Sequence, residues 1–332
     1  MKEKNKGFTL VELLAVIVIL ALIALIATPI ILNVINDAKK QAAKDSAYGY
    51  MDAVEKYIVS SELEDKSIQD RTYSVEELNS MGVSVKGSTP DNGNIEIKEG
   101  AVKNYNLGID GYYITKDEVK KVSTTKSFKN GTAVYYNPET GNKCSKEEAK
   151  STTGTKRGCM KWYVFNDKEE NATVNVILDH NTTANVAYNS TESNSEMKEV
   201  KEALENDTKD WKNTARLITA NEIAKITGHP TFDASKENQD GFYLDSNNQT
   251  QIANSTNKSK YAWLFDYTYD CTSYGCNKSD SSTWGYWTST TKTGTTNYAW
   301  LVHRNGYLYY DYVTYADYGI RPVITISKSN IS

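Results

Sequence analysis

Apolar side chains are concentrated in residues 8–32, which read FTLVELLAVIVILALIALIATPIIL and contain one charge, Glu12. About 20 apolar residues in a helix span the hydrocarbon core of a bilayer. The seven residues before this stretch carry three lysines and one glutamate, and such a basic flank stays on the cytoplasmic side. The pattern predicts a transmembrane segment over residues 8–32, with the bulk of the chain on the outer side of the membrane.

Beyond residue 32 the apolar positions recur at helical spacing, with charged residues between them. This spacing is typical of an amphipathic helix that buries one stripe. We therefore expect one continuous helix over residues 8–61, roughly 80 Å long at 1.5 Å per residue. The stripe consists of Ile35, Ala38, Ala42, Ala43, Ala47, Tyr50, Met51, Val54, Tyr57 and Ile58.

Residues 62–126 alternate between short apolar runs and turn residues. A short helix is expected around residues 76–78, and strands at residues 94–98 and 111–115. A few antiparallel strands laid on the long helix would bury its stripe. The sequence therefore predicts a small antiparallel sheet in this region.

A polar stretch at residues 124–131 is the expected linker to a second region, residues 127–332, which is long enough for its own core. Strands are expected at residues 160–165, 174–178 and 321–326, and helices at residues 196–204 and 219–226. Thr219 and Glu222 have the spacing of a capping box. Two strands flanking Asn305–Gly306 predict a hairpin. The fold class is α+β throughout.

Composition and charge exclude several functions. The formal net charge is -4, and no basic run follows the first residues, so nucleic-acid binding is disfavoured. No glycine-rich phosphate motif and no Ser/His/Asp or Cys/His constellation is recognisable. We expect no enzyme activity, no cofactor and no metal site.

Four cysteines are present, Cys144, Cys159, Cys271 and Cys276, and none forms a CxxC pair. In an extracellular region the simplest disulfide pairing joins Cys144 to Cys159 and Cys271 to Cys276. Three connectivities are allowed, and four reduced or buried thiols are the alternative.

Three tryptophans, Trp263, Trp284 and Trp287, are candidate contacts for a sugar ring or a protein partner, because aromatic rings stack on such ligands. The alternative is that Trp287 belongs to the core.

The N-terminal residues KGFTLVELL, Lys6 to Leu14, resemble the processing and assembly motif of type IV prepilins and type II secretion pseudopilins. The resemblance implies cleavage after Gly7 by a prepilin peptidase, which removes residues 1–7 as a leader, and N-methylation of Phe8. It implies partners as well, namely other pilin or pseudopilin subunits and an inner-membrane assembly platform. Glu12 matches the acidic assembly position of the family, and Pro29 matches its helix-loosening proline.

Elementary physics favours the same roles. A carboxylate inside hydrocarbon costs several kcal/mol and usually marks a function or a partner. A plain signal anchor explains the length of the apolar stretch but not Glu12. The free amine of a neighbouring copy's Phe8 would neutralise Glu12 and set the axial register between copies. Pro29 lacks a backbone N–H, so we expect it to kink or locally melt the helix.

The C-terminal segments Gly285–Ser289, Ala299–Trp300, Asn305–Gly306 and Gly319–Val323 resemble the closing half of formylglycine-generating and C-type-lectin-like domains of bacterial surface proteins. This resemblance implies a fold and carries no active site.

Three hypotheses follow. The first is a type IV pilin-like filament subunit, a minor or decorated one, that presents an extracellular adhesion or interaction domain to a host or surface ligand. The second is a pseudopilin of a type II secretion or DNA-uptake apparatus. The third is a membrane-anchored carbohydrate-binding module or enzyme. The expected location is the cytoplasmic membrane, with the N-terminus inside, and then an extracellular filament or the cell surface after processing.

Overall fold

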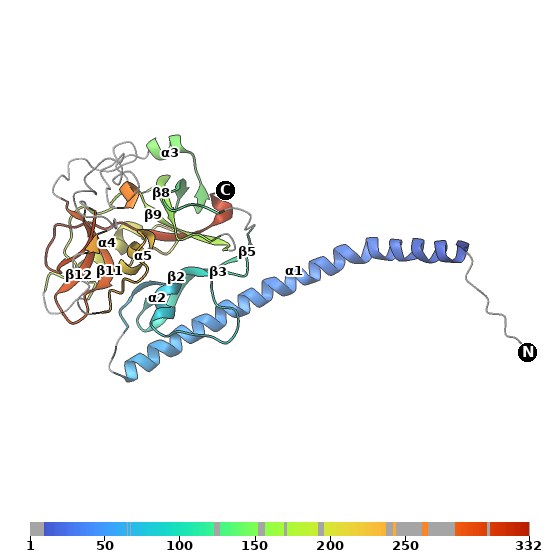
Figure 1. Cartoon of the computed structure of the whole chain (residues 1–332), viewed down its shortest axis with the longest axis horizontal. Coiled ribbons are helices and arrows are strands. Elements are labelled where there is room, and N and C mark those ends of the chain that lie inside the picture. Colours follow the sequence, from blue (N-terminus) through green and yellow to red (C-terminus); the bar gives the residue numbers. More distant parts are fainter. Residues whose placement is uncertain are drawn as a thin grey trace, which may run out of the picture.

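A computed structural model of the chain describes residues 10–64, 66, 68–122, 127–151, 157–168, 171–191, 196–236, 242–243, 261–264, 283–303 and 306–331. A long helix, α1 (Leu10–Leu63), projects from a body that contains the remaining elements (Figure 1). The helix was expected over residues 8–61, and the described helix ends two residues later.

The first half of α1 extends away from the body, and its second half lies along a five-stranded antiparallel sheet (Figure 1). In the first sheet the strands are ordered β1-β2-β3-β4-β5. Their bounds, with that of the short helix α2, are β1 (Arg71–Ser74), α2 (Val75–Ser80), β2 (Asn92–Lys98), β3 (Ala101–Ile109), β4 (Tyr112–Thr115) and β5 (Val119–Lys121).

From Ala43 onward the predicted stripe of α1 fills the core beneath this sheet, whereas its first three members, Ile35, Ala38 and Ala42, are exposed and were wrongly included. Ala47, Tyr50, Val54 and Ile58 are each at most 1% exposed and pack against residues such as Leu107 of β3. Burying an apolar side chain of this size contributes roughly 1.5–3 kcal/mol. The small antiparallel sheet is therefore present, and it covers the helix as the periodicity predicts.

Two further sheets build the rest of the body. The second sheet has the order β14-β9-β8-β6-β7, and the third has the order β10-β13-β12-β11. The bounds of all these elements are β6 (Ala133–Asn137), β7 (Asn142–Lys143), α3 (Lys146–Ser151), β8 (Met160–Phe165), β9 (Thr173–Leu178), α4 (Glu199–Thr208), α5 (Ala220–Ile226), β10 (Phe242–Tyr243), β11 (Gly285–Thr291), β12 (Tyr298–His303), β13 (Tyr307–Tyr312), β14 (Val323–Ser327) and a 3₁₀ turn (Lys328–Asn330).

Local sequence signals predicted the bounds of one of these elements and the cap of another correctly. Strand β8 has the predicted bounds, and α5 begins with a complete capping box in which Thr219 and Glu222 bond reciprocally. The hairpin β12–β13 pairs Val302 with Leu308. Gly306 has φ 88°, the left-handed conformation that a type I′ turn needs, and Asn305 lies outside the described residues.

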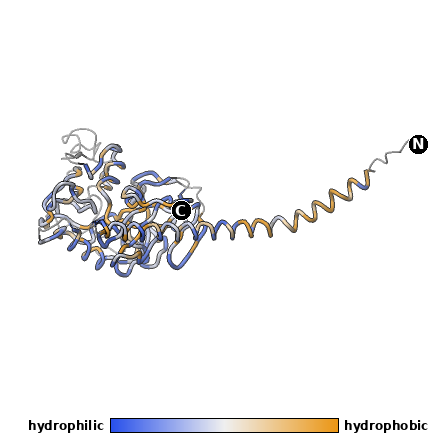
Figure 2. The backbone as a smooth tube through the Cα atoms, turned by 90° about the horizontal axis from the view of Figure 1, so that it is seen from below, coloured by the Kyte–Doolittle hydropathy of each residue, from blue (hydrophilic) through white to orange (hydrophobic). Residues whose placement is uncertain are grey.

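The helix continues through Pro29 without a break, so the expected local melting is not observed. Its axis changes direction gradually along the projecting half in both views (Figures 1 and 2). Within a single copy, the hydrogen bond removed by one proline is not enough to end a helix this long.

Candidate functional site

The projecting half of α1 is apolar on every side. From Leu10 to Ile35 all the leucine, isoleucine and valine side chains are between 43% and 84% exposed. Figure 2 shows the same segment as a hydrophobic stretch outside the body. Among the described residues, α1 is the one helix long and apolar enough to cross a membrane. A surface of this kind is stable only in lipid or against other apolar helices.

Two of the four singled-out residues of the N-terminal segment, Glu12 and Pro29, lie in the described part of α1. Glu12 is exposed and occupies the first turn of α1, where the helix dipole favours a negative charge. Pro29 lies within the helix, and Gly7 and Phe8 lie outside the described residues.

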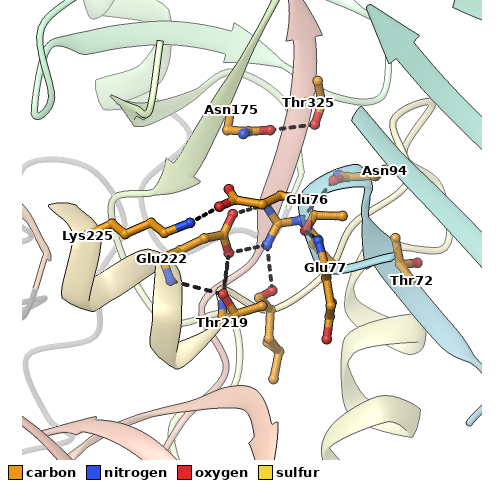
Figure 3. Close-up of polar contacts among 12 residues, drawn as sticks. Thr72, Glu76, Glu77, Asn94, Asn175, Thr219, Glu222, Lys225 and Thr325 are labelled. Atoms are coloured by element: carbon orange, nitrogen blue, oxygen red, sulfur yellow. Dashed lines mark hydrogen bonds and ion pairs between the residues drawn. The ribbon is translucent and has the colours of Figure 1, made fainter. Parts of the chain in front are cut away.

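A buried polar junction joins the first sheet to the C-terminal part of the body. Arg216 is 1% exposed and forms a two-point ion pair with Glu222 of α5, at 2.6 and 2.8 Å. Its Nε donates to Oδ1 of Asn94 on β2 at 2.8 Å. Figure 3 shows Glu222 of α5 and Asn94 of β2 among the polar side chains of this junction. Such a bidentate pair has a defined geometry as well as a favourable energy.

Amide side chains extend the junction on either side of Arg216. Asn106 of β3 donates to the carbonyl of Thr325 at 2.6 Å, and Asn213 donates to the same carbonyl at 3.0 Å. Asn92 donates to the carbonyl of Thr173 at 2.9 Å. Because the amides of Asn106 and Asn213 are buried and donate hydrogen bonds, moving one part of the body against the other would leave polar groups unsatisfied. The junction therefore holds the C-terminal part in one orientation relative to α1.

Sequence reasoning missed this junction. It identified Glu222 through the capping-box spacing, but its partner Arg216 is set by tertiary packing. Asn94 and Arg216 are 122 positions apart, and the sequence contains no local signal for such a pair.

The three candidate tryptophans have different environments. Trp287 is completely buried, donates its Nε1 hydrogen to the carbonyl of Val186 at 2.8 Å and packs edge-on against Tyr188. It cannot touch a ligand, so its place among the candidate contacts was wrong. Trp263 is half-buried against Tyr163, and its carbonyl accepts a hydrogen bond from Arg321. Trp284 is 42% exposed, which makes it the most accessible of the three.

The structure contains a disulfide between Cys144 and Cys159, whose Cα atoms are 6.0 Å apart. This bond ties the start of α3 to the start of β8. Cys271 and Cys276 lie outside the described residues. Within the described ranges no group of three or more His, Cys, Asp or Glu side chains is placed to hold a metal ion.

His180 is buried at the end of β9, although its sequence context suggested no role. Desolvation, together with the nearby positive charge of Arg321, lowers its pKa from 6.5 to about 4. The imidazole is therefore neutral in the folded protein at neutral pH. Next to it, burial raises the pKa of the Asp179 carboxyl against the opposing effect of Lys161 and Arg321.

The described part of the chain thus combines an apolar helix that suits a membrane anchor with a folded body at its other end. Comparison with family models identifies the anchor more closely. Residues 2–28 match the prokaryotic N-terminal methylation motif. The match supports the prepilin and pseudopilin family, and it implies processing by a prepilin peptidase and assembly with other pilin subunits.

No curated protein and no solved structure matches the chain. The resemblance of its C-terminal segments to lectin-like domains therefore stays a prediction.

Proposed function

We propose that this chain is a minor or decorated type IV pilin-like subunit that presents its C-terminal body outside the cell for adhesion or another surface interaction. One observation carries the proposal. No described element of the chain covers the apolar half of α1, and the methylation motif at residues 2–28 includes most of this half. A helix exposed in this way needs lipid before assembly and neighbouring helices after it.

The body supports a minor or decorated role. It contains two further sheets besides the small sheet that covers the helix (Figure 1). A body of this size is difficult to pack at every step of a thin fibre. The junction at Arg216 holds this bulk in a defined orientation. The proposed role is one of assembly and presentation rather than catalysis.

Intact-mass analysis of the protein from its native host tests the proposal. The mature chain is expected to begin at Phe8 and to carry one added methyl group. A Gly7→Val variant should keep the seven-residue leader, because a side chain hinders the close approach of a peptidase to the backbone. A native protein that still begins at Met1 would contradict the proposal.

A second measurement separates a pilin from a pseudopilin of a secretion or DNA-uptake apparatus. If the protein decorates surface fibres, quantitative mass spectrometry should find it in the sheared filament fraction, at a lower molar amount than a major subunit. Complete retention in the membrane fraction would favour the pseudopilin alternative.

A further inference from the structure

A polar cleft of about 640 Å³ opens beside the Arg216 junction, between the first sheet and the C-terminal part of the body. Its walls come from three places: the β1–α2 corner, the start of β2, and the C-terminal part around residues 166–175 and α5. Lys225 of α5 forms an ion pair with Glu76 of α2 across one side of the cleft (Figure 3).

Asparagine dominates the lining. The one large apolar residue in it, Val75, is 2% exposed. The amide side chains lining the cleft are Asn79, Asn92, Asn130, Asn166, Asn171 and Asn175. An amide presents two donors and an acceptor, which matches the hydroxyl groups of a sugar.

The charges around the cleft balance. Glu76 is paired with Lys225, Glu222 with Arg216, and Asp167 with Lys328 at 2.8 Å. Asp91 and Lys168, which also line the cleft, contribute one negative and one positive formal charge. A cleft with no net charge has little attraction for phosphate or for a divalent cation.

Two amides on the wall of the cleft have hydrogen-bonding groups that no described residue uses. Asn171 is 3% exposed, its side chain forms no hydrogen bond with a described residue, and its amide is not one of the fully enclosed polar groups without a partner. Asn175 accepts a bond from Thr325 through Oδ1, and its N–H groups are likewise not enclosed. Both amides therefore reach the solvent of the cleft, where a ligand can replace the water that they bond.

We propose that this cleft binds a neutral saccharide through its asparagine amides. The proposal rests on the proposed presentation of the body outside the cell, where such ligands occur. An extended peptide fits less well, because the lining contains no apolar pocket for a side chain. Hydrogen bonds supply the recognition, so each lost amide weakens binding by up to roughly tenfold.

The test uses the full-length chain in detergent, applied to an array of neutral oligosaccharides, anionic glycans and peptides, followed by titration calorimetry with any hit. Neutral glycans are expected to bind, and Asn171→Ala should raise the Kd about tenfold. The melting temperature of this variant should hardly change, since its amide makes no bond within the described protein. Asn142→Ala, on the exposed strand β7, is the matched control and should bind normally.

Lys168→Trp provides a second variant on the exposed rim, where the substitution does not disturb the core. Its bulky ring should narrow the entrance and weaken binding as well. The proposal is overturned if no neutral glycan binds, if only anionic glycans or peptides bind, or if a bound glycan is retained equally by both variants. Intact mass of the same preparation reports N-terminal processing separately, so a failed glycan test leaves the assembly role intact.

Discussion

The two halves of α1 have the same secondary structure and opposite surroundings. In the first half, Ile19 is 56% exposed, as are its apolar neighbours, whereas in the second half Ile58 is 1% exposed beneath the first sheet. Both halves are apolar enough to require burial, but the described part of the chain covers only one of them. The second half therefore belongs to the folding of the body, and the first belongs to an environment that other molecules provide.

The comparison suggests a division of roles along one helix: the second half stabilises the body, and the first half serves membrane insertion and subunit association. Changes in the covered half should alter the free energy of unfolding of the body. Changes in the projecting half should leave that free energy unchanged and act on membrane insertion or on subunit association. The experiments below test this separation from the largest expected effect to the smallest.

Glu12→Ala should abolish assembly and leave the body folded. If a neighbouring copy's amine is left without its counter-charge in an apolar environment, the cost of several kcal/mol corresponds to at least about a hundredfold loss in association. The measurement is the yield of sheared filaments, with intact mass to confirm normal processing. Glu55→Ala, at an exposed position on the covered half, is the control and should assemble. Normal filaments from Glu12→Ala would rule out the proposed register role.

Arg216→Met should destabilise the body by about 3–5 kcal/mol, because Glu222 and Asn94 lose their buried partner. Urea unfolding of the full chain in detergent measures the change. Lys225→Met removes the exposed pair with Glu76 and should cost about 1 kcal/mol or less. If the two variants lose equal stability, the buried junction is no more important than a surface ion pair. The double variant Arg216→Met with Glu222→Leu should recover part of the loss.

Ile58→Ala should lower the free energy of unfolding by about 2–5 kcal/mol through lost burial and the cavity that remains. The same substitution at Ile19 should leave unfolding of the body unchanged, since this side chain touches no part of it. The pair is matched in chemistry and differs only in which half of α1 it changes. Equal destabilisation by both would show that the projecting half also supports the body.

Acid should weaken the body through His180. The unfolded imidazole takes up a proton near pH 6.5, whereas the buried one resists protonation until about pH 4. Stability is therefore lost as the pH falls from about 6.5 towards 4, by up to about 3 kcal/mol. His180→Gln should remove this component, measured as the difference in melting between pH 7 and pH 4. The raised pKa of Asp179 acts in the opposite direction in both proteins, so the comparison cancels it. His303→Gln is the control, and an acid response unchanged by His180→Gln would contradict the assignment.

Sequence periodicity predicted those parts of the fold that depend on local patterns. The stripe of α1, strand β8 and the cap of α5 each follow from residues close together in the chain. The N-terminal motif was recognisable for the same reason, because all its residues lie within a short segment.

The missed features depend on distant partners. Strand β3 was not expected, because Asn104 and Asn106 interrupt its apolar pattern. Asn106 is tolerated there since its amide donates to the Thr325 carbonyl, 219 positions away. The asparagine cleft was missed for a related reason, because its amides come from segments that meet only in the folded body.

The stiffness of the Arg216 junction has a geometric consequence for the far end of α1. The projecting half of the helix, Leu10 to Ile35, acts as a lever arm roughly 40 Å long, so a tilt of about 5° at the body would displace its tip by about 3 Å. A displacement of that size is comparable to the separation of the charges in an ion pair. The buried hydrogen bonds of one guanidinium thus help to position a carboxylate at the opposite end of the molecule.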